Sequence, residues 1–319
     1  MARLTFLTSI LAALAIAEPL PYPGEGSAPV TNVVATKTQP FFGHKGGNYM
    51  PDSGRSDQVH PNTTGEYVKR GKALLARVTG EWVSNGNLAR WDNSNIQDGI
   101  GSGSDSYRMY WGAGRANEGW PTRSQWVSFQ NMFDNNKGLM QNSCAWMGVP
   151  NDSGPEIGAI WDSIQQVAGE TGVDHRFILA VMLQESGGCV RVHTTNYGVR
   201  NPGLMQCHNG DGTCNSDLTG QVQTPCPTGV ITQMIREGTA GTNSGDGLAN
   251  CINQAGTGTD QDFYRAARIY NSGSVDGSTR LECGIATHCY ASDVANRLTG
   301  WVNAAHGCTC DDNFASCGC

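Results

Sequence analysis

HRFILAVMLQES, residues 175–186, is the stretch that decides the fold, because seven consecutive apolar residues in it lead to a carboxylate. Asp174 before it is a preferred N-cap residue, and Gly187 after it is a preferred helix terminator. The stretch therefore predicts a helix of about three turns. At 3.6 residues per turn, Glu185 falls in the middle of the apolar face of that helix.

The position of Glu185 has two interpretations. A carboxylate is rarely buried without a partner or a chemical task, so backbone donors or an arginine could simply satisfy it. Alternatively, burial and the negative end of the helix dipole raise its pKa, and the protonated acid donates its proton to a leaving oxygen. The helix alone does not decide between these two roles.

Three further motifs follow this helix in order. They are GLMQ at 203–206, the segment IYNSG at 269–273, and YASDVANRL at 290–298. Together with Glu185-Ser186, this ordered set resembles the lytic transglycosylase and goose-type lysozyme group, glycoside hydrolase family 23. The resemblance covers residues 151 to about 305. A second GLMQ, at 138–141, has no such helix before it and is interpreted as a coincidence.

The resemblance implies a role for each matching residue. Glu185 would be the catalytic acid that later acts as base, and Ser186 would help to fix it. Gln206 would line the sugar groove. Tyr270 would hydrogen-bond the catalytic carboxyl, and Asn271 would accompany it in the groove.

Two positions depart from the goose-type pattern, because Tyr197 and His208 stand where those enzymes carry aspartates. Asp211 is the nearest candidate for a second carboxylate that activates water. Lytic transglycosylases need no second carboxylate, since the 6-hydroxyl of the substrate is their nucleophile. Both outcomes stay open, with hydrolysis favoured. Tyr290 is expected to begin the last helix rather than to contact sugar.

The fold class expected is mainly α: a lysozyme-like catalytic lobe with loop-rich, disulfide-stabilised insertions and a helical N-terminal extension. Capping boxes at Thr63–Glu66, Thr122–Gln125 and Ser153–Glu156 predict helix starts, whereas residues 189–261 look rich in loops. The expected segments are a signal peptide at 1–17, a Pro/Gly-rich linker or pro-segment at 18–60, the extension at 61–150, the catalytic domain at 151–307 and a Cys-rich tail at 308–319.

Composition indicates the compartment. The first 17 residues have one basic residue, a short apolar run and an A-x-A end, as secretory signal peptides do. All 12 cysteines lie at or after Cys144, which predicts a full disulfide framework rather than a metal site. The formal net charge of −7 argues against nucleic-acid binding, and no later stretch approaches the ~18 apolar residues of a membrane span.

The sequence thus predicts a secreted muramidase. It would cleave the β-1,4 bond between N-acetylmuramic acid and N-acetylglucosamine in bacterial peptidoglycan. The alternatives are a lytic transglycosylase that forms 1,6-anhydromuramic acid, a chitin-directed hydrolase, and a non-catalytic secreted sugar-binding or effector protein. The partners expected are peptidoglycan glycan strands, without nucleic acid or membrane. A monomer without metal or cofactor is expected.

Overall fold

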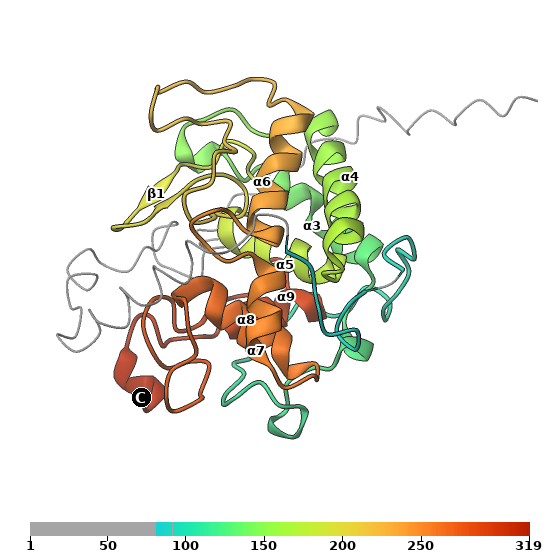
Figure 1. Ribbon diagram of the computed structural model, residues 1–319, viewed down its shortest axis with the longest axis vertical. Helices are drawn as coiled ribbons and strands as arrows, with labels where there is room; N and C mark the ends of the chain where they lie inside the picture. Colours follow the sequence, from blue (N-terminus) through green and yellow to red (C-terminus); the bar gives the residue numbers. More distant parts are fainter. Residues whose placement is uncertain (1–80, 91) are drawn as a thin grey trace, which may run out of the picture. The chain divides into compact units, whose positions relative to one another are not determined.

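The computed structural model describes residues 81–90 and 92–319 (Figure 1). The expected signal peptide, the linker and the capping box at Thr63 lie outside these residues. Within them the chain is mainly α-helical, and its only sheet has two short antiparallel strands. No helix in this part of the chain is long and apolar enough to cross a membrane.

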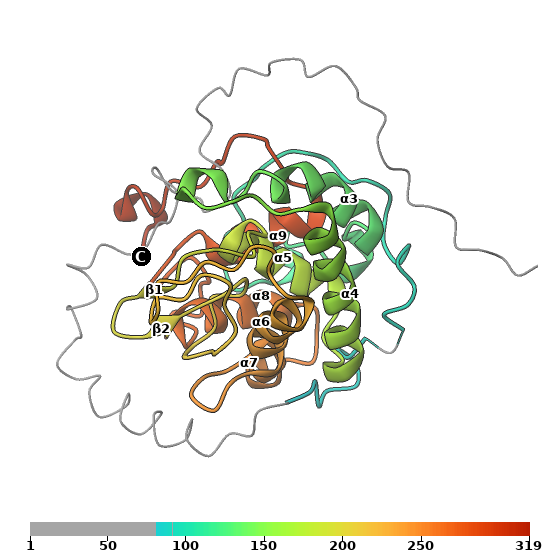
Figure 2. The ribbon, with the colours of Figure 1, turned by 90° about the horizontal axis from the view of Figure 1, so that it is seen from above.

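The described part of the chain contains seven α-helices. They are α3 (Phe129–Met140), α4 (Gly154–Thr171), α5 (His175–Ser186), α6 (Thr228–Ala240), α7 (Leu248–Ala255), α8 (Gln261–Ser272) and α9 (Tyr290–Thr299). The strands β1 (Thr195–Asn196) and β2 (Arg200–Asn201) form a hairpin. The 3-10 turns are η1 (Ala116–Glu118), η2 (Arg123–Gln125), η3 (Ala145–Met147) and η4 (Phe314–Cys317). In Figures 1 and 2 the hairpin lies on the side of α6 away from α4.

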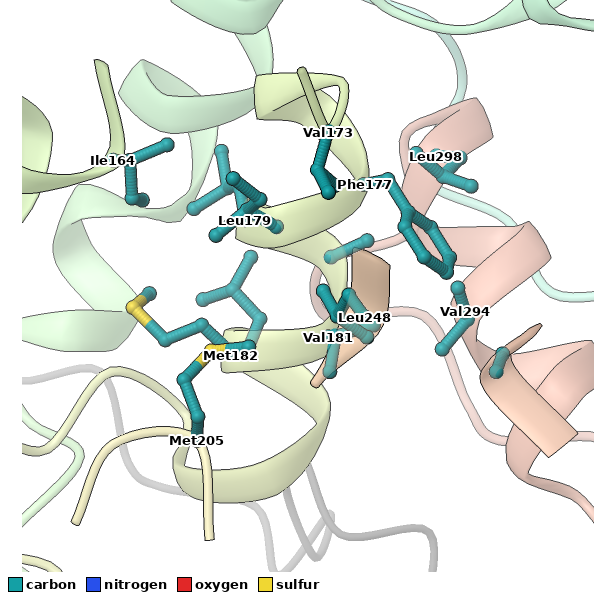
Figure 3. Close-up of a cluster of buried hydrophobic side chains, with 14 of the residues drawn as sticks. Ile164, Val173, Phe177, Leu179, Val181, Met182, Met205, Leu248, Val294 and Leu298 are labelled. Atoms are coloured by element: carbon teal, nitrogen blue, oxygen red, sulfur yellow. The ribbon is translucent and has the colours of Figure 1, made fainter. Parts of the chain in front are cut away.

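Helix α5 is the centre of the core. It packs against α3, α4, α6 and α9. As predicted, the Asp174 carboxylate caps it by accepting the Arg176 N–H, and Gly187 ends it in the left-handed conformation. Figure 3 shows Leu179 and Met182 on one side of the helix and Phe177 on another, facing α9. The helix is therefore apolar on all sides rather than on one face.

The N-terminal region differs from the expected helical extension. Between residues 81 and 128 the described chain holds only η1, η2 and loops. The capping box at Thr122 is present, but it caps η2, and α3 begins after Ser128. Trp126 in this region packs on α8, where it donates to the Tyr264 hydroxyl at 3.0 Å and contacts Phe263 edge to face. The box at Ser153 opens α4 as predicted.

The stretch 189–261 contains two helices that the sequence did not predict, α6 and α7. Its Gly and Thr content suggested loops. However, Ile231, Met234 and Ile235 have the spacing of one helical face, and all three are buried. Burial of that face against α4 and α7 compensates for the low helix propensity of the glycines.

Five disulfides hold the loops after α3. The pairs are Cys144–Cys189, Cys214–Cys226, Cys283–Cys319, Cys289–Cys308 and Cys310–Cys317. The Cys-rich tail is thus bonded to the segment just before α9. Cys207 and Cys251 are buried and lie outside these five bonds. The expectation that all 12 cysteines are oxidised is therefore not confirmed for these two.

Candidate active site

Glu185 is the residue at which the buried helix α5 reaches solvent. Every other residue of α5 is buried, whereas Glu185 is partly exposed. Burial raises the pKa of its carboxyl to about 7, and the hydroxyl of Tyr290, which donates to Oε1 at 2.5 Å, acts in the opposite direction. The carboxylate therefore lies at the edge of the apolar core rather than in the middle of an apolar face.

The tyrosine that bonds this carboxyl is Tyr290, not Tyr270. Tyr290 is the first residue of α9, as predicted, and the packing of α9 on α5 brings its phenol to Glu185. The Tyr270 hydroxyl donates instead to the carbonyl of Met205 at 2.7 Å. Burial raises the pKa of Tyr270 well above its usual value, and the nearby Cys207 and Glu185 raise it further. Tyr270 thus lies near the acid but supports the GLMQ segment.

Ser186 closes the helix behind Glu185. Its hydroxyl donates to the carbonyl of Met182 at 3.0 Å and accepts the N–H of Gly188 at 3.2 Å. Gly188 has a positive φ of 87°, and an added Cβ there would lie 2.5 Å from Cγ of Met140. Met140 belongs to the first GLMQ copy, which therefore packs against the end of α5.

Gln206 links the second GLMQ to the hairpin. Its Oε1 accepts the Thr195 hydroxyl at 2.8 Å, and its Nε2 donates to the carbonyls of Gly203 at 3.0 Å and His193 at 3.2 Å. Its φ of 45° is in the left-handed region, so the backbone is held in a tight turn. The amide is therefore occupied in holding the GLMQ turn against the hairpin and the residue His193.

Asn271 has a structural role in the described contacts. Its Oδ1 accepts the backbone N–H of Thr287 at 3.1 Å and bonds the guanidinium of Arg268. Arg268 also donates to the Thr287 carbonyl at 2.7 Å. These bonds fix the segment that leads into α9 and hence the place where Tyr290 begins.

Asp211 is exposed, and its backbone is held by a carboxylate of α6. Its N–H donates to the Glu237 carboxylate at 3.1 Å, and Gly212 N–H donates to the same group at 3.0 Å. Glu237, on α6, is thus a carboxylate that the motifs did not single out, and it fixes the loop carrying Asp211. Tyr197 is exposed between β1 and β2, and burial lowers the pKa of the half-buried His208. Among the described residues, no hydrogen bond joins Asp211 to Glu185.

In the part of the chain that the structure describes, three groups of residues lie close enough together to hold a metal ion. Two of them, Cys144–Asp152–Cys189 and Cys289–Cys308–Asp311, contain the sulfurs of a disulfide, which are poor ligands. The third, Asp98–Asp174–His175, is neutralised by Arg90 and Arg176. The donors of all three groups are therefore engaged within the protein.

Comparisons of the chain with protein-family models, with curated proteins and with solved structures find no match.

Proposed function

We propose that the protein is a muramidase that cleaves the β-1,4 bond between N-acetylmuramic acid and N-acetylglucosamine in bacterial peptidoglycan, with Glu185 as the general acid. The observation that carries the proposal is the half-buried carboxyl at the end of α5, whose pKa is raised to about 7. Such a group is still partly protonated near neutral pH and can protonate a glycosidic oxygen. The ordered motifs around it supply the substrate class.

The contacts around Glu185 fit an acid that changes role during the reaction. Glu185 first gives its proton to the departing sugar oxygen. The resulting carboxylate is stabilised by the Tyr290 hydroxyl and then accepts a proton from the incoming nucleophile. In hydrolysis that nucleophile is water, and Asp211 is the proposed second carboxylate that activates it. Asp211 is exposed, its backbone N–H is held by Glu237, and its charge acts on the nearby Arg200.

The alternative nucleophile is the 6-hydroxyl of the muramic acid itself. It would need only Glu185, and it gives a 1,6-anhydro product that is lighter than the hydrolysed muropeptide by one water. Mass spectrometry of digested peptidoglycan separates the two outcomes. We expect the reducing product, and Asp211→Asn should slow its formation. An anhydro product would assign the chain to the transglycosylases.

Glu185→Gln tests the role of the acid. The change keeps the size of the side chain and removes its titrating proton, so wall clearing should fall by about 10²–10⁴-fold while the thermal unfolding midpoint changes little. Glu118→Gln is the control, because Glu118 accepts the Ala113 N–H at 2.8 Å, a bond that an amide oxygen can keep. A Glu185→Gln enzyme within a few-fold of the wild type would remove Glu185 from the chemistry.

Substrate choice needs a separate comparison. Release of soluble fragments from peptidoglycan but not from chitin is the expected result, and the reverse would support a chitin-directed hydrolase. Wall binding without cleavage by the wild type would support the sugar-binding or effector alternative. The five disulfides fit an oxidising compartment. We propose that the protein is secreted as a monomer into the extracellular space, where it contacts bacterial cell walls.

A further inference from the structure

Gln184, the residue before Glu185, makes a second link between α5 and α9. Its Nε2 donates to Oδ2 of Asp293 at 3.0 Å, and its Oε1 accepts from Nε of Arg297 at 2.9 Å. All three residues are buried. The amide can be placed in one orientation only, because its nitrogen faces a carboxylate and its oxygen faces a guanidinium.

Asp293 is itself held from two distant parts of the chain. Its Oδ1 accepts the Tyr107 hydroxyl at 2.5 Å and contacts Nε2 of His306 at 2.8 Å. Tyr107 and His306 also pack against each other and against Trp301. The N-terminal region and the segment after α9 therefore fix the carboxylate that Gln184 binds.

The two links between α5 and α9 are adjacent. Gln184 and Glu185 are neighbours at the end of α5, while Tyr290 and Asp293 are three residues apart, on one side of the first turn of α9. A shift of α9 along α5 would therefore break both links together. Breaking the buried Gln184 link would leave a carboxylate and a guanidinium short of a partner, which is costly.

From this geometry we infer that Gln184 is a positioning residue, which holds the Glu185 carboxyl against the Tyr290 hydroxyl through Asp293 and Arg297. It touches no substrate in this role. Where it concerns turnover, the inference rests on the proposed function. The contact that Gln184 secures exists in the free protein and can be measured without any substrate.

The measurement is the titration of the Glu185 carboxyl by NMR in the full chain carrying ¹³C-labelled glutamate, with its signal assigned from its loss in Glu185→Gln. Gln184→Met keeps the length of the side chain and removes both hydrogen bonds; Gln184→Asn keeps the amide but is too short to reach both partners. Tyr290→Phe gives the reference for a lost phenol bond. Tyr107→Phe is the matched control, since it removes a bond to the other carboxylate oxygen of Asp293, Oδ1, which His306 still holds.

Both Gln184 variants should raise the pKa of Glu185 towards the value in Tyr290→Phe, because the bond that stabilises the carboxylate is loosened. In the Tyr290→Phe background, Gln184→Met should shift the pKa of Glu185 little further. Made alone, Tyr107→Phe should leave the pKa of Glu185 near that of the wild type. An unchanged or lower pKa in a folded Gln184 variant, or an equal shift in both backgrounds, overturns the inference.

The effect on turnover is measured separately. Gln184→Met should lower kcat on peptidoglycan by about tenfold to a hundredfold with little change in KM, as expected for a misplaced catalytic group. If the wild type does not cleave peptidoglycan, the proposed function fails while the titration still tests the positioning. If one Gln184 variant does not fold, the other gives the same two measurements.

Discussion

At the scale of single residues, the Glu185 site depends on a balance between burial and one hydrogen bond. Burial favours the protonated acid, whereas the Tyr290 hydroxyl favours the carboxylate, and burial is the larger effect. Glu185 has no arginine or lysine partner in the described contacts, so its carboxyl is not neutralised as Asp174 is by Arg176. This difference separates a candidate acid from an ordinary structural carboxylate.

Removing the Tyr290 hydroxyl should change both rate and pH dependence. Tyr290→Phe takes away a bond to the charged form, so the pKa of Glu185 rises. Activity that needs the protonated acid is lost as pH rises through this pKa. The alkaline limb of the pH–rate profile should therefore shift from about pH 7 to higher pH. We expect kcat to fall by roughly ten- to a hundredfold, the value of one hydrogen bond to a charge. A profile that stays in place would show that the bond does not act on the acid.

Tyr270→Phe should behave differently, although the sequence assigned it the same role. Its hydroxyl bonds the carbonyl of Met205, so the change leaves a buried carbonyl unsatisfied. The expected cost is about 1–3 kcal/mol of unfolding free energy, measured by chemical denaturation. The alkaline limb of the pH–rate profile should stay at the pH of the wild type. An upward shift of that limb would mean that Tyr270 bonds Glu185 in solution, as the family resemblance implied.

At the scale of the elements, local signals predicted some helices and missed others. The N-caps at Ser153 and Asp174 follow from residue preferences within one turn, whereas the helix start at Tyr290 followed from the motif shared with the family; all three are confirmed. Helix α6 was missed because its Gly and Thr content suggested loops, although the apolar spacing of Ile231, Met234 and Ile235 is that of a helical face. The capping box at Thr122 shows the reverse, a correct local signal that opens only the 3-10 turn η2.

The candidate site was also predictable only in part. Glu185 stands out in the sequence because it is an ionisable residue in an otherwise apolar helix. Its partner Tyr290 lies 105 residues away, and nothing at position 290 marks its phenol as the donor. Glu237 could have been noticed only as an acid on a helix whose existence was itself missed. Partners that meet through helix packing are invisible until the packing is known.

Helix α6 offers a test of how closely the elements around the site pack. An added Cβ at Gly238 would lie 2.2 Å from Cβ of Met205 and 3.0 Å from the Tyr270 hydroxyl oxygen. Gly238→Ala should therefore push α6 from the GLMQ turn and cost about 1–3 kcal/mol of unfolding free energy. Gly229→Ala, on the same helix with open space around it, is the control and should be neutral or slightly stabilising. Equal midpoints for both variants in denaturant would contradict the close approach.

At the scale of the whole molecule, the described structure contains carboxyls whose pKa values are raised. Burial raises that of Asp152 to about 7, that of Glu185 to about 7 and that of Asp311 to about 6. Each of these groups binds a proton more tightly in the folded state than in the unfolded state, where aspartate and glutamate titrate near pH 4. Their contribution to stability is therefore fully present below about pH 4 and is lost as pH rises through the folded pKa.

Other buried carboxyls act in the opposite direction. Burial opposes the ionisation of Asp98, Asp174 and Asp293, but hydrogen bonds and neighbouring cations outweigh it and hold their pKa values below the usual range. Their contribution is present above about pH 4 and is lost as pH falls through the folded pKa. The first set favours folding less as pH rises above about 4, and the second favours it less as pH falls below about 4, so together these groups favour the folded state most at about pH 4.

Asp152 is the member of the first set that a single change tests best. Its carboxyl accepts the Val190 N–H at 3.2 Å and pairs with Arg191 at 3.3 Å, and Arg191 also bonds Glu156. An asparagine keeps an acceptor for Val190 and leaves Arg191 its other partner. The wild-type unfolding midpoint should fall between pH 5 and pH 8, and Asp152→Asn should fall less steeply, because one group that must ionise while buried is gone.

The size of this effect can be resolved by calorimetry, since each kcal/mol moves the midpoint by about 2–4 °C in a domain of this size. Asp162→Asn, an exposed position on α4, removes the same charge and should keep the wild-type slope. If Asp152→Asn and Asp162→Asn gave parallel lines, the decline would come from net charge alone. A decline carried by Asp152 would mean that ionisation of its buried carboxyl weakens the contact between the start of α4 and the segment at Val190 and Arg191, in the same pH range in which Glu185 loses its proton.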